Sequence, residues 1–310
     1  HHQKVEAEVA AEAKRQQQME DLHGKLAAFY TDDHHQFIRA DMIHQDLSKL
    51  KNDLSSLKNE KGYSALETTY QDIQSKIQDI QKVNEWFVAP VIVDDHLADD
   101  IKLKADKEIQ TIETDNTDFG KLIQQAQTEA KNQYAELQTA KEKTAIVFKD
   151  GKVVGSATRD QYKMAKEAVE KVKNTDLSAQ LNEQLKQVDK MLTDKEKKEE
   201  EEKKKAEEAK KAAAILSEQV RRFNSIPEEK RDWKKADAIT EKLLGVFRKS
   251  QDYLVRLDWD DNVIFPQQAV QNNLYALKEA MEYLEKGEIA PALESFYSID
   301  NNCYAFQFER

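Results

Sequence analysis

The scarcity of glycine and proline is the feature that most constrains this chain, because its 310 residues contain only 7 glycines and 4 prolines. Average proteins contain about 7% glycine and 5% proline, about three times as much as this chain. These two residues mark most tight turns, so a chain with so few of them has few turns and long elements. Charged residues reach 35% and hydrophobic residues only 39%, which suits helices with narrow apolar stripes. The composition therefore predicts an all-α, elongated fold and excludes sandwiches, barrels and doubly wound folds.

The charge balance and the single cysteine limit the possible partners and sites. A net charge of −11 argues against nucleic acid as a partner, because phosphate binding requires clustered cations. Cys303 is the one cysteine, which excludes an internal disulfide framework. No apolar run reaches the roughly 18 residues that a membrane span requires. His1-His2 resembles the end of a purification tag, so we expect any membrane anchor to lie outside this chain.

A pattern of a short apolar stretch, an acidic turn and two helices occurs three times along the chain. Its openings are Phe29-Tyr30-Thr31-Asp32-Asp33, Val91-Ile92-Val93-Asp94-Asp95 and Val147-Phe148-Lys149-Asp150-Gly151. One such hairpin cannot bury its own apolar stripe, so neighbouring copies are expected to stack. We therefore predict a leading helix over residues 1–28 and three tandem helical hairpins over residues 29–88, 89–142 and 143–193.

Apolar residues at alternating steps of three and four define two helices in each copy. The first helices carry Ile43, Leu47, Leu50, Leu54 and Leu57; Ile101, Ala105, Ile109 and Ile112; and Tyr162, Ala165, Val169 and Val172. The second helices carry Leu66, Tyr70, Ile73, Ile77 and Ile80; Phe119, Leu122, Ala126, Ala130 and Tyr134; and Leu177, Leu181, Leu185, Val188 and Leu192. The register predicts equivalent buried places for Leu50, Ile109 and Val169, and for Ile73, Ala126 and Leu185.

Capping residues mark where several of these helices begin. Asn116-Thr117-Asp118 and Asn174-Thr175-Asp176 occupy matching breaks, and such side chains accept hydrogen bonds from free helical N–H groups. Ser64 with Glu67, and Thr158 with Gln161, have the spacing of capping boxes.

The last third of the chain has a different composition. Residues 194–222 form a Lys- and Glu-rich stretch with favourable pairs four residues apart, such as Glu199–Lys203, and this predicts a charged helical linker. A frayed charged linker is the alternative. Residues 223–310 hold Trp233 and Trp259 and several apolar stripes, which predicts a small C-terminal helical bundle.

Two acidic turns contain histidine and invite a metal-site hypothesis. Asp32-Asp33-His34-His35 and Asp94-Asp95-His96 offer carboxylates and imidazoles, which bind zinc or nickel. Adjacent residues rarely converge on one ion, and aspartate also stabilises turns. We therefore expect turn roles at both places and no metal, and we expect His44 to lie on a helix surface.

The other candidate residues also have structural interpretations. Asp258, Asp260 and Asp261 around Trp259 lack the glycine and glutamate of a calcium loop, so capping is expected there. Cys303 is expected to be a buried, inert thiol. Gly151 is expected in a turn with positive φ, because Gly151 and Gly155 lack the lysine of a phosphate-binding loop. Trp86 and Phe87 either pack between the first two copies or stack on glycan rings, and packing is the expected role.

The three-copy region, about residues 27–193, resembles the extracellular part of the streptococcal mid-cell-anchored protein Z family. The resemblance rests on residues 29–33, 147–154 and 174–177. It implies the outer part of a single-pass membrane protein that marks the division site and engages the cell wall. The far end of that family's outer region, with which wall binding is associated, has no match here. Residues 257–262 and 298–302 resemble the helical tail of clostridial zinc aminopeptidases, which would imply a fusion.

The sequence thus predicts no catalytic residues, no cofactor and no metal. The resemblance implies a non-enzymatic extracellular scaffold on a Gram-positive surface, with peptidoglycan or surface and division proteins as partners. Two alternatives remain open at this point: a protein-binding helical repeat module, and an accessory segment of a peptidase or an engineered fusion.

Overall fold

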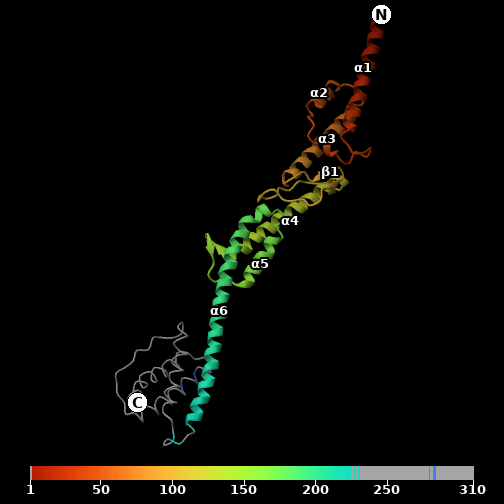
Figure 1. Ribbon diagram of the computed structural model, residues 1–310. Coiled ribbons are helices and arrows are strands. Elements are labelled where there is room, and N and C mark those ends of the chain that lie inside the picture. The colour runs from red at the N-terminus through yellow and green to blue at the C-terminus, as the bar shows by residue number, and fades with distance from the viewer. Residues whose placement is uncertain (1, 225–226, 228–229, 231–278, 280–281, 284–310) are drawn as a thin grey trace. The chain divides into compact units, whose positions relative to one another are not determined.

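The computed structural model describes residues 2–224, 227, 230, 279 and 282–283 (Figure 1). Helices dominate this part of the chain, which confirms the predicted all-α class. The chain divides into two compact units, residues 1–192 and 193–310. The predicted C-terminal bundle lies almost wholly outside the described residues, as do Asp258, Asp260, Asp261 and Cys303. The elongated shape of the whole chain stays a prediction.

The leading helix α1 covers His2–Ala27, as predicted. Residues 2–18 are exposed, whereas Leu22 and Leu26 are only 3% and 1% exposed and enter the core. An ion pair between Arg15 and Glu60 (2.8 Å) joins α1 to the turn before α3. The C-terminal half of α1 therefore holds the helix in the fold.

The predicted first helix of copy one, with its stripe from Ile43 to Leu57, forms only in its second half, around Leu50 and Leu54. The structure has a 3-10 turn η1 (Ala40–Met42) and a short helix α2 (Ser48–Ser56), with residues 43–47 outside both. The carboxylate of Asp46 accepts the N–H of Ser48 at 2.9 Å, an N–H that a continuous helix would direct to the carbonyl of His44. His44 is exposed, but it lies in a turn and not on a helix.

The second helix of copy one is confirmed as α3 (Tyr63–Glu85), although its predicted capping box is wrong. Gly62 occupies the N-cap position with φ of 94°, and no side chain caps the helix there. Gly62 takes a left-handed backbone conformation, which only glycine adopts readily, and α3 begins directly after it at Tyr63. Ser64 therefore lies inside the helix.

Copy two begins with a small hairpin of β1 (Ile92–Val93) and β2 (His96–Leu97), and its predicted first helix is wrong. Residues 98–117 contain no helix. Their backbone is bonded by two buried amides of the following helix. The amide of Gln133 accepts from the N–H of Leu103 (2.8 Å) and donates to the carbonyl of Ile101 (2.9 Å). The amide of Gln127 bonds both backbone groups of Ile112. These amides replace the bonds that a helix would have supplied, and the β-branched isoleucines suit an extended chain.

Helix α4 spans Asp118–Val147. Thr117 accepts the N–H of Gly120 at 3.0 Å, which confirms the predicted cap at this break. The predicted boundary between residues 142 and 143 is wrong, because α4 continues across it. Thr144 and Val147 are 1% and 0% exposed, so the buried stripe of α4 extends through the boundary.

Copy three follows the prediction more closely. The hairpin of β3 (Phe148–Lys149) and β4 (Lys152–Val153) turns at Asp150 and Gly151, whose φ values are 53° and 76°. Two successive residues with positive φ form the tight turn that matches strand twist. Helix α5 (Arg159–Glu170) begins with the predicted capping box of Thr158 and Gln161.

Helix α6 runs from Thr175 to Asn224, so the helical interpretation of the charged stretch is confirmed. Asn174 caps it by accepting the N–H of Asp176 at 3.0 Å. None of the helices in the described part of the chain combines the length and the apolar composition needed to cross a bilayer.

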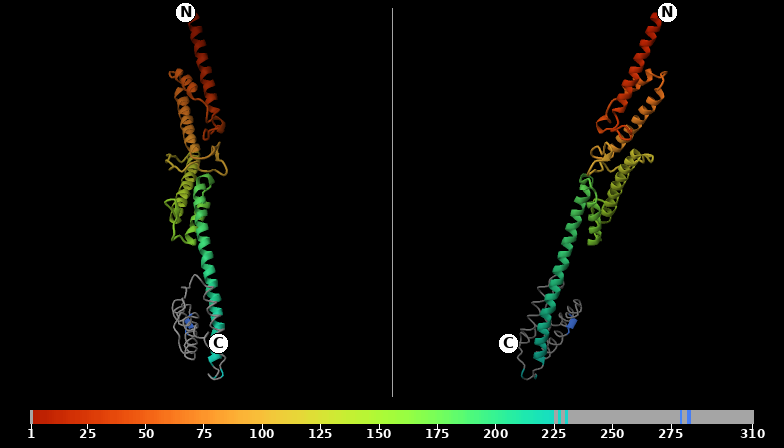
Figure 2. Two further views of the ribbon diagram at one scale, coloured as in Figure 1. Left: turned by 60° about the vertical axis from the view of Figure 1, so that its left-hand side comes forward. Right: turned by 90° about the vertical axis from the view of Figure 1, so that its right-hand side faces the viewer.

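Two hydrophobic cores lie in the first unit, and α4 contributes to both. Figure 2 shows α4 as one unbroken helix. One core takes the α4 residues Phe119 to Ala130, and the other takes Leu137 to Val147. Ile73, Ala126 and Leu185 are all buried, as the register predicted. Of the other predicted set, Ile109 and Val169 are buried, whereas Leu50 is only partly buried.

The turn at Gly151 yields a test with a matched control. A Cβ added at Gly151 or at Gly155 would meet no atom within 4 Å, but only Gly151 has a left-handed φ. Gly151→Ala should lower the stability of the α4–α5 region by about 1 kcal/mol, the cost of a left-handed alanine. Gly155→Ala should be neutral or raise it by about 0.4–1 kcal/mol through the unfolded state. Hydrogen exchange of the α5 amides measures both, and equal effects would contradict the turn geometry.

Candidate functional site

The first acidic turn, at Asp32 to His35, is held by local contacts. Asp32 accepts the backbone N–H of His34 at 2.9 Å, which is a turn contact as expected. His35 has φ of 54° and its ring stacks on the ring of Tyr30, with centroids 4.2 Å apart. Nowhere in the described residues do three or more His, Cys, Asp or Glu side chains gather in a way that could hold a metal ion.

The second acidic turn joins the hairpin of copy two to copy one. Asp94 has φ of 53° and its carboxylate accepts the N–H of Ala40 at 2.8 Å, across 54 residues of sequence. Asp95 pairs with the exposed ring of His96 at 3.0 Å. The histidine hydrogen bond lowers the pKa of Asp95. Asp94 thus acts in a turn, as predicted, and also fixes one copy to the next.

Trp86 and Phe87 follow α3 at the junction between the first two copies. Phe87 is 2% exposed and forms an isolated antiparallel β-bridge with Leu103 of copy two, which confirms its predicted packing role. Trp86 is only partly buried and lines a groove of about 590 Å³. We name this the Trp86 groove; its walls are the end of α3 (Lys82, Glu85 and Trp86) and the extended segment of Leu103–Ala105 and Lys107–Ile112.

A second hollow, of about 640 Å³, is polar and gathers residues from three separate parts of the chain. We name it the polar hollow. Its lining comes from the loop after α1 (Tyr30, His35, Gln36), from α3 (Thr68, Thr69, Asp72, Ser75, Lys76, Asp79) and from the start of α4 with the residues before it (Glu113, Thr114, Asp115, Thr117, Phe119, Gly120, Ile123).

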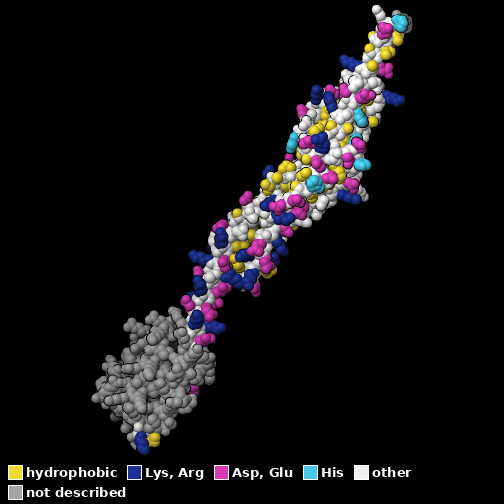
Figure 3. All heavy atoms as spheres, turned by 45° about the vertical axis from the view of Figure 1, so that its right-hand side comes forward, with side chains coloured by type: hydrophobic (Ala, Val, Ile, Leu, Met, Phe, Trp, Pro, Cys, Tyr) yellow, Lys and Arg dark blue, Asp and Glu magenta, His cyan; other side chains and the backbone are white. Residues whose placement is uncertain are grey.

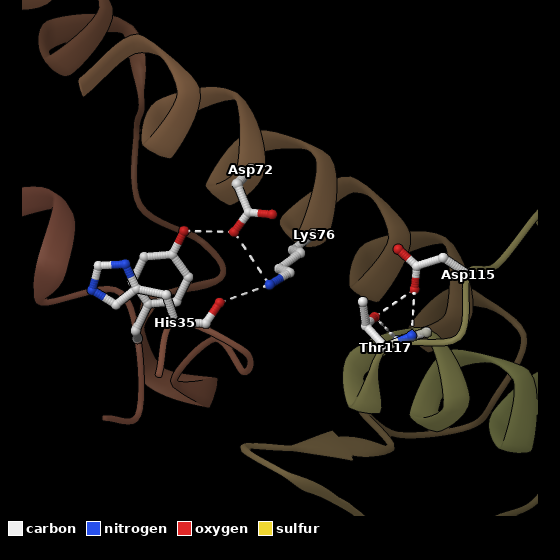
Figure 4. Close-up of polar contacts among 7 residues, drawn as sticks. His35, Asp72, Lys76, Asp115 and Thr117 are labelled. Atoms are coloured by element: carbon white, nitrogen blue, oxygen red, sulfur yellow. Dashed lines mark hydrogen bonds and ion pairs between the residues drawn. The ribbon is translucent and has the colours of Figure 1, made fainter. Parts of the chain in front are cut away.

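Lys76, which is 9% exposed, lines the polar hollow and connects several of its residues (Figure 4). The Nζ of Lys76 donates to the carbonyl of His35 at 2.9 Å and pairs with Asp72 at 3.2 Å. It also lies 5.7 Å and 5.3 Å from the ring centroids of Tyr30 and Phe119, within cation–π range. These contacts offset the cost of removing the ammonium group from water.

Tyr30 completes this network by donating its hydroxyl to Asp72 at 2.6 Å. Burial, together with the hydrogen bond and the charge of Asp72, raises the pKa of Tyr30 far above its usual value. The phenol therefore stays protonated and acts as a permanent donor. Its geometry is that of a structural bond between the loop after α1 and α3.

The α4 side of the hollow depends on close packing at Gly120. Asp115 accepts hydrogen bonds from the N–H and the hydroxyl of Thr117, which lower the pKa of Asp115 (Figure 4). A Cβ at Gly120 would lie 2.4 Å from the backbone oxygen of Asp115. Only glycine therefore allows the Asp115 turn to fold onto the first turn of α4.

Asp79 is a partly buried carboxylate of the polar hollow without a hydrogen-bonded partner among the described residues. It makes no hydrogen bond or ion pair with any residue in the described part of the chain. Burial and the nearby charge of Asp115 raise the pKa of Asp79, and the charge of Lys82 opposes that shift. Its ionised form is thus a source of instability at neutral pH.

The sequence predicted the turns but neither the Trp86 groove nor the polar hollow. Asp72 lies four residues before Lys76 on α3, but the other partners are the carbonyl of His35, 41 residues away, and Phe119 in α4, and no local spacing signals those. A lysine within the α3 stripe of Ile73, Ile77 and Ile80 is the one local signal, because a charged residue next to such positions requires a partner.

The tyrosine contact can be tested with two identical substitutions. Tyr30→Phe removes a hydrogen bond to a carboxylate and should lower the free energy of unfolding by about 1.5–3 kcal/mol. Tyr70→Phe is the control, because Tyr70 is 6% exposed and its hydroxyl bonds no group among the described residues. Urea denaturation followed by Trp86 fluorescence, with Trp233 and Trp259 replaced by phenylalanine, measures both. Equal losses would show that the Asp72 bond contributes nothing.

The carboxylate of Asp79 predicts a pH-dependent effect. The raised pKa means that the folded state holds the Asp79 proton more tightly than the unfolded state does. Ionisation of Asp79 is therefore destabilising above the raised pKa, and this penalty vanishes as the pH falls below the ordinary value of 3.8. Asp79→Asn should raise the urea midpoint at pH 7 and lose its advantage near pH 3. A midpoint that falls at pH 7 would mean that the carboxylate stabilises the fold.

Comparison with known proteins gives one match. Neither the curated proteins nor the solved structures contain a match to the chain. The family model described as MapZ extracellular domain 1 matches residues 2–129. The matched span takes in α1, which the resemblance seen in the sequence left out, and it ends within α4, before copy three. No match supports the peptidase-tail resemblance of the final residues. The part of the chain from α1 to the first half of α4 is thus similar to MapZ extracellular domain 1, which supports an extracellular location.

Proposed function

We propose that the chain is a non-enzymatic extracellular scaffold on a Gram-positive cell surface, linked to the placement of the division site. The observation that supports this proposal is the match of residues 2–129 to MapZ extracellular domain 1. The described architecture agrees with a scaffold, because both cores of the first unit are built along the single helix α4.

The proposal includes wall or surface association, with peptidoglycan or division proteins as the partner, which is what the sequence resemblance implies. Acidic and basic side chains are interspersed over the visible face of the first unit (Figure 3). Together with the net charge of −11, this distribution disfavours polyanions such as nucleic acid or teichoic acid.

One observation favours the alternative of a protein-binding module. The first 17 described residues of α1 are exposed and include Val5 and Val9, which are 46% and 62% exposed. These two valines lie four residues apart and therefore share one face of the helix. Such a face suits a partner helix, whereas wall binding does not require it.

Sedimentation with purified streptococcal sacculi tests the scaffold proposal. The chain should co-sediment with sacculi, and labelled chain added to growing streptococci should collect at division sites. A Val5→Ser/Val9→Ser double variant should behave like the unchanged protein, since the substitutions lie on an exposed face remote from the cores. Failure to sediment, together with absence of label from division sites, would reject the proposal. Loss of labelling in the double variant alone would support the protein-binding alternative.

A further inference from the structure

The extended segment in the Trp86 groove has backbone groups without protein partners. Residues 107–115 run without helix, turn or bend. The N–H and C=O groups of Glu108, Ile109, Gln110 and Thr111 make no hydrogen bond to any group in the described part of the chain. Such a run of free groups is a template for pairing with another extended chain.

A few residues earlier, the same segment is paired with the residues that follow α3. Val88 donates to the carbonyl of Lys102 at 2.9 Å, and Lys104 donates to the carbonyl of Trp86 at 2.9 Å. These bonds join residues 86–88 to residues 102–104 around the Phe87–Leu103 bridge. The pairing stops at Lys104, and the groove of about 590 Å³ lies beside the segment from there to Ile112.

The other side of the segment is occupied by α4. Ile112 directs both of its backbone groups to the amide of Gln127. In an extended chain the N–H and C=O groups of successive residues point alternately to the two sides of the strand. The groups of Thr111 therefore point away from Gln127 and α4.

The side chains around the Trp86 groove indicate which side chains an added strand needs. Lys82, Lys104 and Lys107 make no side-chain hydrogen bond or ion pair with the rest of the described chain. Glu85 and Glu108 oppose them, which leaves a net charge of +1 around the partly buried Trp86 in a protein of net charge −11. The indole surface of Trp86 favours an apolar or aromatic side chain, and ammonium groups that have no hydrogen-bonded partner favour carboxylates.

We propose that the Trp86 groove binds an extended acidic peptide of a partner protein, which adds as a strand along residues 108–111. One apolar side chain of the peptide packs against Trp86, and its carboxylates face Lys82, Lys104 and Lys107. Main-chain hydrogen bonds supply affinity and these side chains supply selectivity, as in other strand-addition sites. This goes beyond the scaffold role, because it assigns a surface and a partner chemistry that wall binding does not need.

A defined peptide pool tests the proposal. The pool consists of hexapeptides that are acetylated at the N-terminus and amidated at the C-terminus. Each carries Asp or Glu at alternate positions, and Val, Ile, Leu, Phe or Tyr at the positions between them. Trp86 fluorescence reports binding when Trp233 and Trp259 are phenylalanine. The pool should contain members that bind saturably with a Kd below about 1 mM, the range of weak specific contacts. The same pool with lysine in place of the acids should not bind.

Two pairs of variants separate strand addition from simple charge attraction. Thr111→Pro and Thr111→Ala both remove the hydroxyl that Lys131 contacts, but only proline removes the backbone N–H. Thr111→Pro should weaken binding about tenfold and Thr111→Ala by less than about twofold, because one net hydrogen bond is worth up to about a factor of ten. Lys107→Gln should weaken binding several-fold, whereas Lys166→Gln on the exposed face of α5 should not.

The outcomes decide the proposal without ambiguity. Absence of saturable binding by every member of the acidic pool overturns it. Equal weakening by Thr111→Pro and Thr111→Ala, with unchanged helical circular dichroism in both, overturns the added strand. Equal weakening by Lys107→Gln and Lys166→Gln would show that the peptides bind by non-specific charge attraction, and this result also overturns the proposal. Sedimentation of the Thr111→Pro variant with sacculi separates this result from the scaffold proposal, which requires no free N–H at Thr111.

Discussion

The continuity of α4 is the constraint on which the rest of the first unit depends. One face of its N-terminal half, from Phe119 to Ala130, packs against α3 and the residues around it. Its C-terminal half, from Leu137 to Val147, packs against α5 and α6. Gln127 in the first stretch and Gln133 between the two stretches bond the extended segment of copy two. Each neighbouring element is therefore positioned by a different stretch of one thirty-residue helix.

The two buried glutamines explain why the copies differ although their patterns agree. Gln127 and Gln133 are 1% and 4% exposed, and burying an amide requires that its donor and acceptor groups be satisfied. The extended backbone of Ile101, Leu103 and Ile112 satisfies them. A helix over the same residues would have used its own N–H and C=O groups, leaving the oxygens of both amides without their donors in the core. The cost of two unpaired amide oxygens outweighs the modest gain of one short helix.

The sequence predicted the long helices well, but it did not predict where a helical stripe of apolar residues fails to form a helix. The stripes of α3, α4, α5 and α6, and the caps at Thr117 and Thr158, follow from residues close in the chain, where spacing fixes geometry. The stripe of Ile101 to Ile112 has the same spacing and forms no helix, because its partners lie about 15 to 32 residues further along in α4. Both hollows were missed for a similar reason. Their walls come from segments that meet only in the folded chain, such as Tyr30 with Asp72.

The shared helix has a mechanical consequence. Because α4 passes from one core into the other without a loop, the junction between them contains no flexible hinge in the backbone. A pull along this unit would travel through the axial hydrogen bonds of α4, where tension is divided among parallel bonds in each turn. Sideways bending would instead have to compress the stripe from Phe119 to Val147 against its neighbours. The unit is therefore expected to be stiff under tension and to transmit displacement from one core to the other with little slack.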